Sequence, residues 1–301
     1  WIGSNGGLDK LDRASNRWTH YIHDLSNPLS ISNNNVMAIL DDDTRGIMWI
    51  GTWNGLNKFD KRSGMFTTYF LDSNNIFEDQ NHIVSLCVDH LGTFWVGTAG
   101  GLSIFDKNEG KYARNILEHT SLQTLSTQYV QMVREDRMNK LWIATFEGLI
   151  RWDPVTDKLT CFRNNPNDST SLCHDFVLSI YQDHEGTLWF GTKEGLNCLD
   201  LTMNKFTRYS QNDGMIGHAI YGILEDDHGN LWLSSNKGLS KFNIRTKRFR
   251  NYDSQDGLQS DEFEQVAFCK SKTGEMFFGG INGVTSFFPD SIVDNPMVPP
   301  I

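Results

Sequence analysis

Short apolar stretches separated by polar turns recur along the whole chain. Residues 188–196, Leu-Trp-Phe-Gly-Thr-Lys-Glu-Gly-Leu, show an apolar run, a turn bounded by glycine and the start of a second apolar run. Variants of this segment have an anchor aromatic residue at positions 1, 49, 95, 142, 189, 232 and 277, so the copies lie 43 to 48 residues apart. β-type patterning with a period in the forties predicts a radial repeat in which each copy forms one blade of a β-propeller.

Each copy divides into four predicted strands, which we name A to D in chain order. In one copy they cover residues 176–182, 187–192, 196–200 and 205–209. The residues two places after the start of strand A are mostly small, as expected for an inner strand, and the alternation in strand D suits an outer, half-exposed one. The same division predicts A strands that begin at Val36, Ile83, Val130, Val177, Ile220 and Glu264.

The two ends of the chain contain incomplete copies. Residues 1–24 supply strands B, C and D, and residues 263–288 supply strands A, B and C, with five complete copies between them. The sequence therefore predicts an all-β, seven-bladed propeller of four-stranded antiparallel blades over residues 1–290. The first and last blades are either left short or completed by residues outside this chain. Proline-rich residues 291–301 are predicted to be a linker.

Residues that recur in every copy are interpreted as scaffold. The anchor tryptophans are expected to pack between sheets, and the recurring glycines to supply positive φ in turns. The residues six places after the A-strand starts are expected to accept backbone hydrogen bonds in Asx-type turns. Neighbouring histidines are interpreted as turn residues and not as metal ligands. The turn residues are Asp42, Asp89, Asp136, Asp183, Asp226 and Lys270, and the histidines are His90, His184 and His228.

The composition fits a folded, acidic domain. Apolar residues make up 39% and aromatic residues 12% of the chain, which is enough for a packed core. A net charge of −10 argues against nucleic-acid binding, and no apolar run approaches the length of a membrane span. The chain begins inside a repeat, so the absence of a signal peptide says nothing about export.

The five cysteines do not predict a zinc site or a redox dithiol, because no Cys-x-x-Cys pair occurs. Cys87 and Cys269 occupy the same repeat position, and Cys198 occupies the position of Lys58 in another copy. These thiols are interpreted as free and at least half-buried. Cys161 and Cys173 flank one loop, where they either stay free or form a disulfide in an oxidising compartment.

Functional residues are expected where the copies differ and not where they agree. The sequence has no Gly-x-Ser-x-Gly, His-Glu-x-x-His or phosphate-binding loop, so no catalytic residue, metal or cofactor is predicted. The B–C turns and the connections that precede strand A are expected to open onto one face. The candidate ligand-binding residues there are Trp53, Asn54, His82, Tyr129, Phe146, Glu147, Lys193, Glu194, His218, Lys237, Glu262 and Asn282.

This mixture of residues suits sugar recognition, because aromatic faces stack on pyranose C–H surfaces while planar polar groups bond hydroxyls. Trp53 is the sharpest candidate, since no other copy has tryptophan at that position; alternatively it packs on a neighbouring loop or domain. The acidic cluster of Asp256, Asp261, Glu262 and Glu264 is either a pair of carboxylates for glycoside hydrolysis or a solvated loop.

The repeat resembles that of the two-component regulator propeller family. The features that carry the resemblance are Leu-Trp-Ile/Phe-Gly-Thr-x-x-Gly-Leu preceded by Asp-x-x-Gly, the connector at residues 165–172, and the closing segments at 256–263 and 277–283. It covers residues 1–290. Such propellers are found in the periplasmic sensor region of inner-membrane hybrid two-component systems, chiefly in gut Bacteroidetes.

The resemblance implies the second, C-terminal propeller of such a sensor, between an N-terminal propeller and a β-sandwich. It further implies a homodimeric full-length protein that detects glycan-derived oligosaccharides and relays the signal to a kinase elsewhere in the protein. This fragment would itself be non-catalytic. The alternatives are a structural or protein-docking propeller and a carbohydrate-active lyase or glycosidase.

Overall fold

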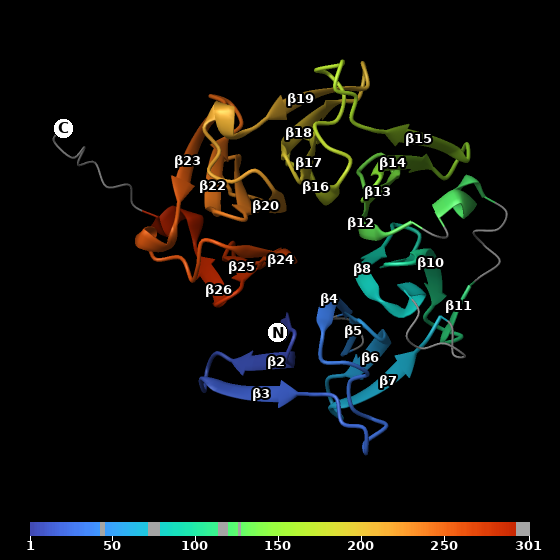
Figure 1. The fold of residues 1–301 in the computed structure, drawn as a ribbon. Helices are drawn as coiled ribbons and strands as arrows, with labels where there is room; N and C mark the ends of the chain where they lie inside the picture. Colours follow the sequence, from blue (N-terminus) through green and yellow to red (C-terminus); the bar gives the residue numbers. More distant parts are fainter. Residues whose placement is uncertain (43–45, 72–78, 114–119, 126–127, 293–301) are drawn as a thin grey trace. The chain divides into compact units, whose positions relative to one another are not determined.

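The computed structural model describes residues 1–42, 46–71, 79–113, 120–125 and 128–292, and over these residues the chain is all-β. They form seven antiparallel sheets, the blades of a β-propeller; five blades have four strands, and the first and last have three (Figure 1). The predicted fold class is confirmed, as is the incompleteness of the terminal blades. The blades belong to two compact units, Trp1–Arg163 and Asn164–Ile301, which we describe in turn.

Unit 1 contains blades 1 to 4. Blade 1 consists of β1 (Ile2–Ser4), β2 (Gly7–Asp12) and β3 (Arg17–Tyr21). Blade 2 consists of β4 (Val36–Asp42), β5 (Ile47–Thr52), β6 (Gly55–Asp60) and β7 (Met65–Tyr69). Blade 3 consists of β8 (Ile83–Val88), β9 (Phe94–Thr98), β10 (Gly101–Asp106) and β11 (Lys111–Tyr112), and blade 4 of β12 (Val130–Glu135), β13 (Leu141–Thr145), β14 (Gly148–Asp153) and β15 (Lys158–Phe162).

Unit 2 contains blades 5 to 7. Blade 5 consists of β16 (Val177–Gln182), β17 (Leu188–Thr192), β18 (Gly195–Asp200) and β19 (Lys205–Tyr209). Blade 6 consists of β20 (Ile220–Glu225), β21 (Asn230–Ser235), β22 (Gly238–Asn243) and β23 (Arg248–Tyr252), and blade 7 of β24 (Phe263–Lys270), β25 (Met276–Gly280) and β26 (Gly283–Phe287). Short 3-10 helices lie in the connections: η1 (Asp79–Asn81), η2 (Ser121–Leu125), η3 (Gln211–Asp213), η4 (Ser254–Asp256) and η5 (Pro289–Ser291).

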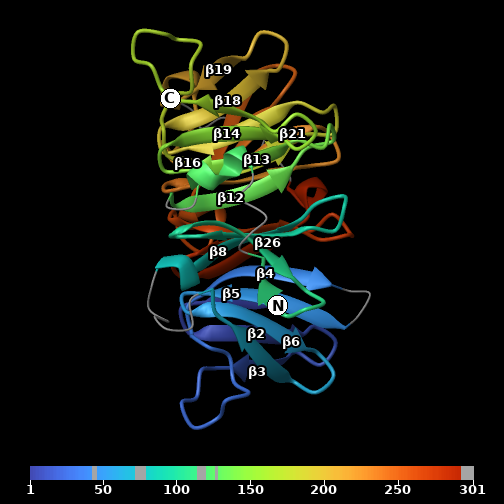
Figure 2. The ribbon, with the colours of Figure 1, turned by 90° about the vertical axis from the view of Figure 1, so that its right-hand side faces the viewer.

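Strand order within a blade follows the chain, as β4-β5-β6-β7 in blade 2 illustrates (Figure 2). Five of the six predicted A strands begin at the predicted residue, from Val36 in blade 2 to Ile220 in blade 6. The pairing register of each of these strands with strand B shifts just after its first residue, as between Val177 and Ser179 in blade 5. The repeat period and the turn residues are therefore sufficient to locate these strands.

The A strand of blade 7 was predicted wrongly. It begins at Phe263 and not at Glu264, and its register shifts between Phe263 and Phe268, where Val266 has a φ of 54°. Two extra residues in this strand displace the count, so Val266 is not the counterpart of Ser85 in blade 3. The turn position belongs to Ser271 and not to Lys270, because the Ser271 hydroxyl accepts the Glu275 N–H at 3.0 Å.

The recurring aspartates accept backbone hydrogen bonds, as predicted, and also hold the anchor tryptophans. Asp183 accepts the Thr187 N–H at 2.8 Å through one carboxylate oxygen and the Trp189 indole N–H at 2.8 Å through the other. The same indole bond joins Asp89 to Trp95, Asp136 to Trp142 and Asp226 to Trp232. Because each indole N–H is satisfied, these tryptophans are buried without an unpaired donor. The sequence pattern did not reveal this second role.

The glycine in Trp-x-Gly-Thr allows neighbouring blades to approach closely. A Cβ atom on Gly3, Gly51 or Gly97 would lie 2.5–2.7 Å from a γ-carbon of Val36, Ile83 or Val130, the first residue of the next A strand. In unit 2, a Cβ on Gly191 would lie 2.6 Å from the Ile220 carbonyl oxygen. The expectation of positive φ is wrong for these four glycines, whose role is steric. It is right for the B–C turns, where Gly55 and Gly195 have φ of 104° and 142°.

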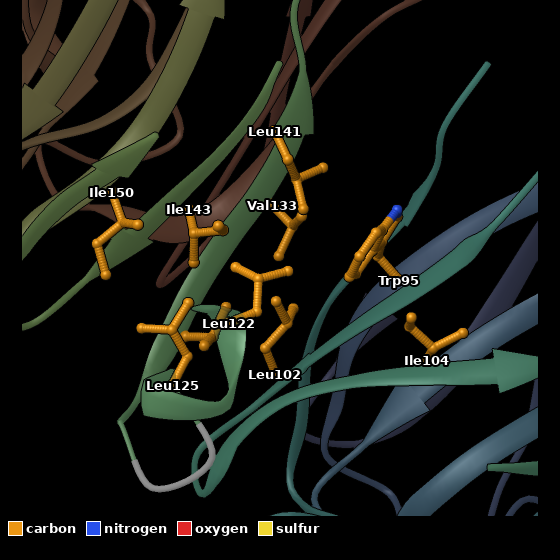
Figure 3. Close-up of a cluster of buried hydrophobic side chains, with 10 residues drawn as sticks. Trp95, Leu102, Ile104, Leu122, Leu125, Val133, Leu141, Ile143 and Ile150 are labelled. Atoms are coloured by element: carbon orange, nitrogen blue, oxygen red, sulfur yellow. The ribbon is translucent and has the colours of Figure 1, made fainter. Parts of the chain in front are cut away.

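Apolar clusters lie between consecutive blades within each unit. Figure 3 shows the cluster between blades 3 and 4, in which Trp95 and Leu102 face Val133, Leu141 and Ile143. The short helix η2 adds Leu122 and Leu125 to this cluster. In unit 2, Trp189 and Leu196 of blade 5 pack with Ile223, Leu233 and Phe242 of blade 6. Each blade is therefore stabilised mainly by its neighbour, as in other repeat folds.

Two A–B turn histidines link neighbouring blades. The His90 backbone N–H donates to Glu135 Oε2 at 2.7 Å, and its Nδ1 lies 2.6 Å from Glu135 Oε1. His184 makes the same pair of contacts with Glu225, at 2.8 and 2.5 Å. The hydrogen bond and the negative charge of Glu225 raise the pKa of His184. These histidines lie in turns, as predicted, and they also join one blade to the last A-strand residue of the next.

The five cysteines are free thiols. Cys87 and Cys269 lie opposite the anchor residues Trp95 and Phe277, which confirms that they share a repeat position. Cys198 lies opposite Trp189, as Lys58 does opposite Trp49. Cys173 Sγ lies 3.0 Å from Thr192 Oγ1, and burial raises the pKa of Cys87 and Cys198 to about 11. The alternative of a Cys161–Cys173 disulfide is therefore not realised in the structure. No helix among the described residues has the length and apolarity needed to cross a membrane.

We predict that Gly97→Ala destabilises the protein, because the new methyl group would meet Val130 Cγ1 at 2.7 Å. Overpacking of this kind costs about 1–3 kcal/mol, which thermal unfolding would detect as a lower midpoint. The control is Gly6→Ala, whose Cβ would meet no atom closer than Ser4 Oγ at 3.5 Å. Equal midpoints for the two variants would refute the steric role of Gly97.

We predict that the stabilisation provided by the His184–Glu225 contact decreases as pH rises. The folded-state pKa of His184 is raised, so the contribution is fully present below the ordinary histidine pKa of about 6.5 and is lost as pH rises through the folded value. The unfolding midpoint of the unmodified protein should exceed that of His184→Gln by more at pH 5.5 than at high pH. Glu225→Gln should remove the same pH dependence, and a difference that grows with pH would contradict this assignment.

Candidate functional site

The B–C turn and the connection before strand A adjoin in each of four blades. The first turn residue donates its backbone N–H to the carbonyl of the residue that precedes strand A: Trp53 to Asn35 at 3.1 Å, Ala99 to His82 at 3.0 Å and Lys193 to Phe176 at 3.0 Å. In blade 7 the Ile281 N–H donates to Glu262 at 3.3 Å. These bonds bring the variable residues of each of these blades together at one end of its sheet.

The threonine that ends strand B shapes the turn that follows. Thr192 Oγ1 donates to the Gly195 carbonyl at 3.0 Å and accepts the Glu194 N–H at 3.2 Å. Thr52 does the same with Gly55 and Asn54 in blade 2. Because the threonine and the glycine together define the backbone, the two intervening side chains can vary without altering the turn. This explains why the candidates fall at these positions.

An aromatic pair joins blades 2 and 3 of unit 1. Trp53 follows β5, and His82 immediately precedes β8. Their rings are stacked, with centroids 6.1 Å apart and planes 22° from parallel. Trp53 is 50% exposed, so a large part of its surface is accessible to a ligand. Asp79 Oδ1 lies 3.7 Å from His82 Nδ1 and places a carboxylate beside the pair.

A second aromatic pair lies in blade 4. Tyr129 precedes β12 and Phe146 follows β13, and their rings stack 4.1 Å apart at 9°. Both residues are half-buried. Burial, followed by the negative charge of Asp79, raises the pKa of the Tyr129 hydroxyl, so it remains a hydrogen-bond donor at neutral pH. We name Trp53, His82, Tyr129 and Phe146 the aromatic rim of unit 1.

Polar groups accompany the aromatic rim. Glu147, next to Phe146, forms an ion pair with Arg163, with Nη2 and Oε2 3.7 Å apart, and both side chains are exposed. Asn54, next to Trp53, is half-buried, and its Oδ1 accepts no hydrogen bond from the residues that the structure describes. The predicted residues of unit 1 therefore combine stacked rings with amide and charged groups.

The predicted residues of unit 2 are more polar. The Lys193 ammonium lies 5.4 Å from the Phe176 ring centroid, in a cation–π contact. His218 is exposed and lies within 3.5 Å of the Asn236 amide nitrogen. Glu194 and Lys237 are also exposed. Glu262 and Asn282 are exposed at the blade 7 turn, where the Asn282 N–H donates to Gln259 Oε1 at 2.8 Å.

The acidic cluster before β24 stabilises its own loop. Asp256 Oδ2 accepts the Asp253 N–H at 3.0 Å in the capping box of η4. Asp261 Oδ1 accepts the Ser254 N–H at 2.7 Å. These bonds favour the structural interpretation over a hydrolytic carboxylate pair. Among the described residues, no group of three or more histidine, cysteine or acidic side chains is placed to hold a metal ion.

Two residues of this surface were missed by sequence reasoning. Asp79 lies three residues before His82, inside the connection and not at its last two positions, which were the only ones considered. Arg163 follows strand β15 and reaches Glu147 across the blade. Only the spatial adjacency of the turn and the connector reveals either residue; the one available signal was their opposite charge to His82 and Glu147.

Comparison with known proteins supports the repeat assignment. Residues 78–100, 171–194 and 214–237 match a family model described as two component regulator propeller. Each match runs from the connector through strands A and B to the B–C turn. No curated protein matches the sequence.

Several solved structures share the fold. The extracellular domain of a putative hybrid two component system from B. thetaiotaomicron has 17% identity and a TM-score of 0.53, and the alignment covers 97% of this chain and 45% of that domain. PorZ, a surface component of the type-IX secretion system of Porphyromonas gingivalis, has 13% identity and a TM-score of 0.66 over 91% of this chain and 42% of its own.

Virginiamycin B lyase from Staphylococcus aureus has 14% identity and a TM-score of 0.59, over 88% of this chain and 85% of its own. At these identities the likeness shows a common propeller fold. The chain spans less than half the length of the B. thetaiotaomicron domain and of PorZ.

Proposed function

Because this chain is built from two-component regulator propeller repeats, we propose that it is a non-catalytic sensor propeller that binds oligosaccharides. The propeller resembles sensor domains of hybrid two-component systems, and extracellular domains of that class have the same fold. The observation that carries the ligand proposal is the aromatic rim of unit 1, where two stacked ring pairs occur at positions that vary between blades.

The chemistry of the rim matches a sugar. The exposed face of Trp53 offers a platform for the C–H surface of a pyranose ring, a contact that is apolar and needs no charge. Asn54, Asp79 and Glu147 offer acceptors to hydroxyl groups around that platform, and Tyr129 offers a donor. A small number of polar groups around an aromatic surface is typical of small-molecule sites.

We place the protein outside the cytoplasm, in the periplasm, as part of an inner-membrane protein. Residues 1–290 would form the propeller and 291–301 a linker toward a β-sandwich; of that linker, residues 293–301 lie outside the described part of the chain. In the full-length homodimer, ligand binding would shift domain geometry and thereby alter a kinase elsewhere in the protein. These steps follow from the sensor proposal.

We predict that Trp53→Ala and Phe146→Ala each weaken oligosaccharide binding by about tenfold or more, because each removes a stacking surface worth roughly 1–2 kcal/mol. Binding would be measured by calorimetry on the complete extracellular region with a panel of neutral and acidic oligosaccharides. The control is Trp18→Ala, which removes a tryptophan of similar exposure, 47%, from the outer strand β3.

Three outcomes would contradict the proposal. If no oligosaccharide binds the folded, unmodified protein, the ligand assignment fails. If binding survives both rim substitutions while association with a neighbouring domain or protein is lost, the propeller is a docking module. Release of product from a polysaccharide by the purified protein would identify an enzyme instead.

A further inference from the structure

Blade 7 exposes one edge of its sheet that the complete blades cover. In blades 2 to 6 a fourth strand pairs with the third, as β19 pairs with β18 and β23 with β22. Blade 7 has the order β24-β25-β26, and within the described part of the chain no strand pairs with the other edge of β26. Such an edge presents unpaired backbone N–H and C=O groups that can pair with another strand.

Side-chain exposure shows how much that edge differs from its counterparts. Val284, the second residue of β26, is 37% exposed, whereas Leu196 and Leu239 at the same position of blades 5 and 6 are fully buried. The third residue, Thr285, is half-buried, whereas Asn197 and Ser240 at that position are fully buried. Blade 7 therefore carries apolar surface where the complete blades have a fourth strand.

The remainder of the receiving surface is arranged as in a complete blade. The Gln259 N–H donates to Thr285 Oγ1 at 3.1 Å. Equivalent bonds join Cys173 to Asn197 in blade 5 at 2.9 Å and Ile216 to Ser240 in blade 6 at 3.3 Å. The connector that lies beside the third and fourth strands of those blades is thus in its usual place in blade 7, although the fourth strand is not among the described residues.

The complete blades show what kind of strand fits. Their fourth strands have a large apolar residue at the second position and an aromatic residue at the fifth. In blade 5, Tyr209 lies opposite Leu196 and Phe206 opposite Leu199. In blade 6, Tyr252 lies opposite Leu239 and Phe249 opposite Phe242, and blade 2 follows the same rule with Phe66 and Tyr69. In blade 7, Val284 and Phe287 occupy the two positions that these aromatic residues would meet.

We propose that the outer edge of β26 binds an antiparallel β-strand of the pattern aromatic-x-x-aromatic, supplied by a segment of the same full-length protein outside residues 1–301. Its first aromatic residue would lie opposite Phe287 and its last opposite Val284. This is strand addition, in which backbone bonds provide affinity and alternate side chains provide specificity.

Two observations favour a strand from the same polypeptide. Residues 1–301 match only 45% of the length of the B. thetaiotaomicron extracellular domain, so proteins of this architecture have further chain available. A tethered strand also binds at high effective concentration, which a short five-residue pairing needs. Residues 293–301 are poor donors, because Pro296, Pro299 and Pro300 lack the N–H that a ladder requires.

The first test is amide hydrogen exchange in the full-length extracellular region. Residues 283–287 should exchange about as slowly as residues 238–242 of β22, and at least about tenfold more slowly than in the isolated chain 1–301. Equally fast exchange of this segment in both proteins would overturn the proposal.

The second test adds a synthetic peptide that contains Lys-Phe-Thr-Arg-Tyr, the sequence of β19, to the chain 1–301. It should bind and raise the unfolding temperature, whereas Lys-Ser-Thr-Arg-Ser should bind at least about tenfold more weakly. Val284→Asp should abolish binding, and Val155→Asp, at a site 86% exposed in a turn of blade 4, should not.

The same peptide should not bind the full-length region, where its own strand already covers the edge. Binding to both proteins would show that no internal strand occupies β26, and binding to neither would show that the edge does not accept a strand of this pattern. Either result would overturn the proposal.

Discussion

The distance between neighbouring blades depends on one small residue in strand B. Gly51, Gly97 and Gly191 leave no room for a Cβ atom, because the first residue of the next A strand lies against their backbone. Close packing of this kind transmits shape, since a group added at one contact must displace an entire blade or distort a strand. The apolar clusters between blades form only because the sheets can approach to this distance.

Polar contacts complete what the glycine contact begins. The aspartate of each A–B turn satisfies both its own turn and the indole N–H of the anchor tryptophan, so a large side chain can be buried between sheets without an unpaired donor. His90 and His184 then join the turn of one blade to a glutamate of the next. Apolar packing thus occupies the middle of each blade contact, and hydrogen-bonded ties lie at the end where the A–B turns are.

This division of labour leaves the opposite end of the sheets available for function. The threonine at the end of strand B and the glycine of the following turn define the backbone there, so the two intervening residues are under little structural constraint. Trp53, Phe146 and Lys193 are such residues, and the structure places each beside a ring from the connector that precedes strand A: His82, Tyr129 and Phe176. A scaffold that repeats while its rim varies is suited to recognition, since new ligands need no change of fold.

The sequence by itself determined the number of blades, most strand boundaries and the positions at which function is expected. It could do so because glycine, aspartate and tryptophan recur at a fixed period, and each has a local physical reason to be where it is. Counting failed in blade 7, where two extra residues widen the irregularity of β24 and shift the turn position to Ser271. Only the tertiary structure showed that the Trp-x-Gly-Thr glycine is steric, that the aspartate holds the tryptophan, and that Trp53 stacks on His82 of the next blade. Periodicity identifies equivalent residues within a repeat, but contacts between blades depend on how the sheets pack and how each side chain turns.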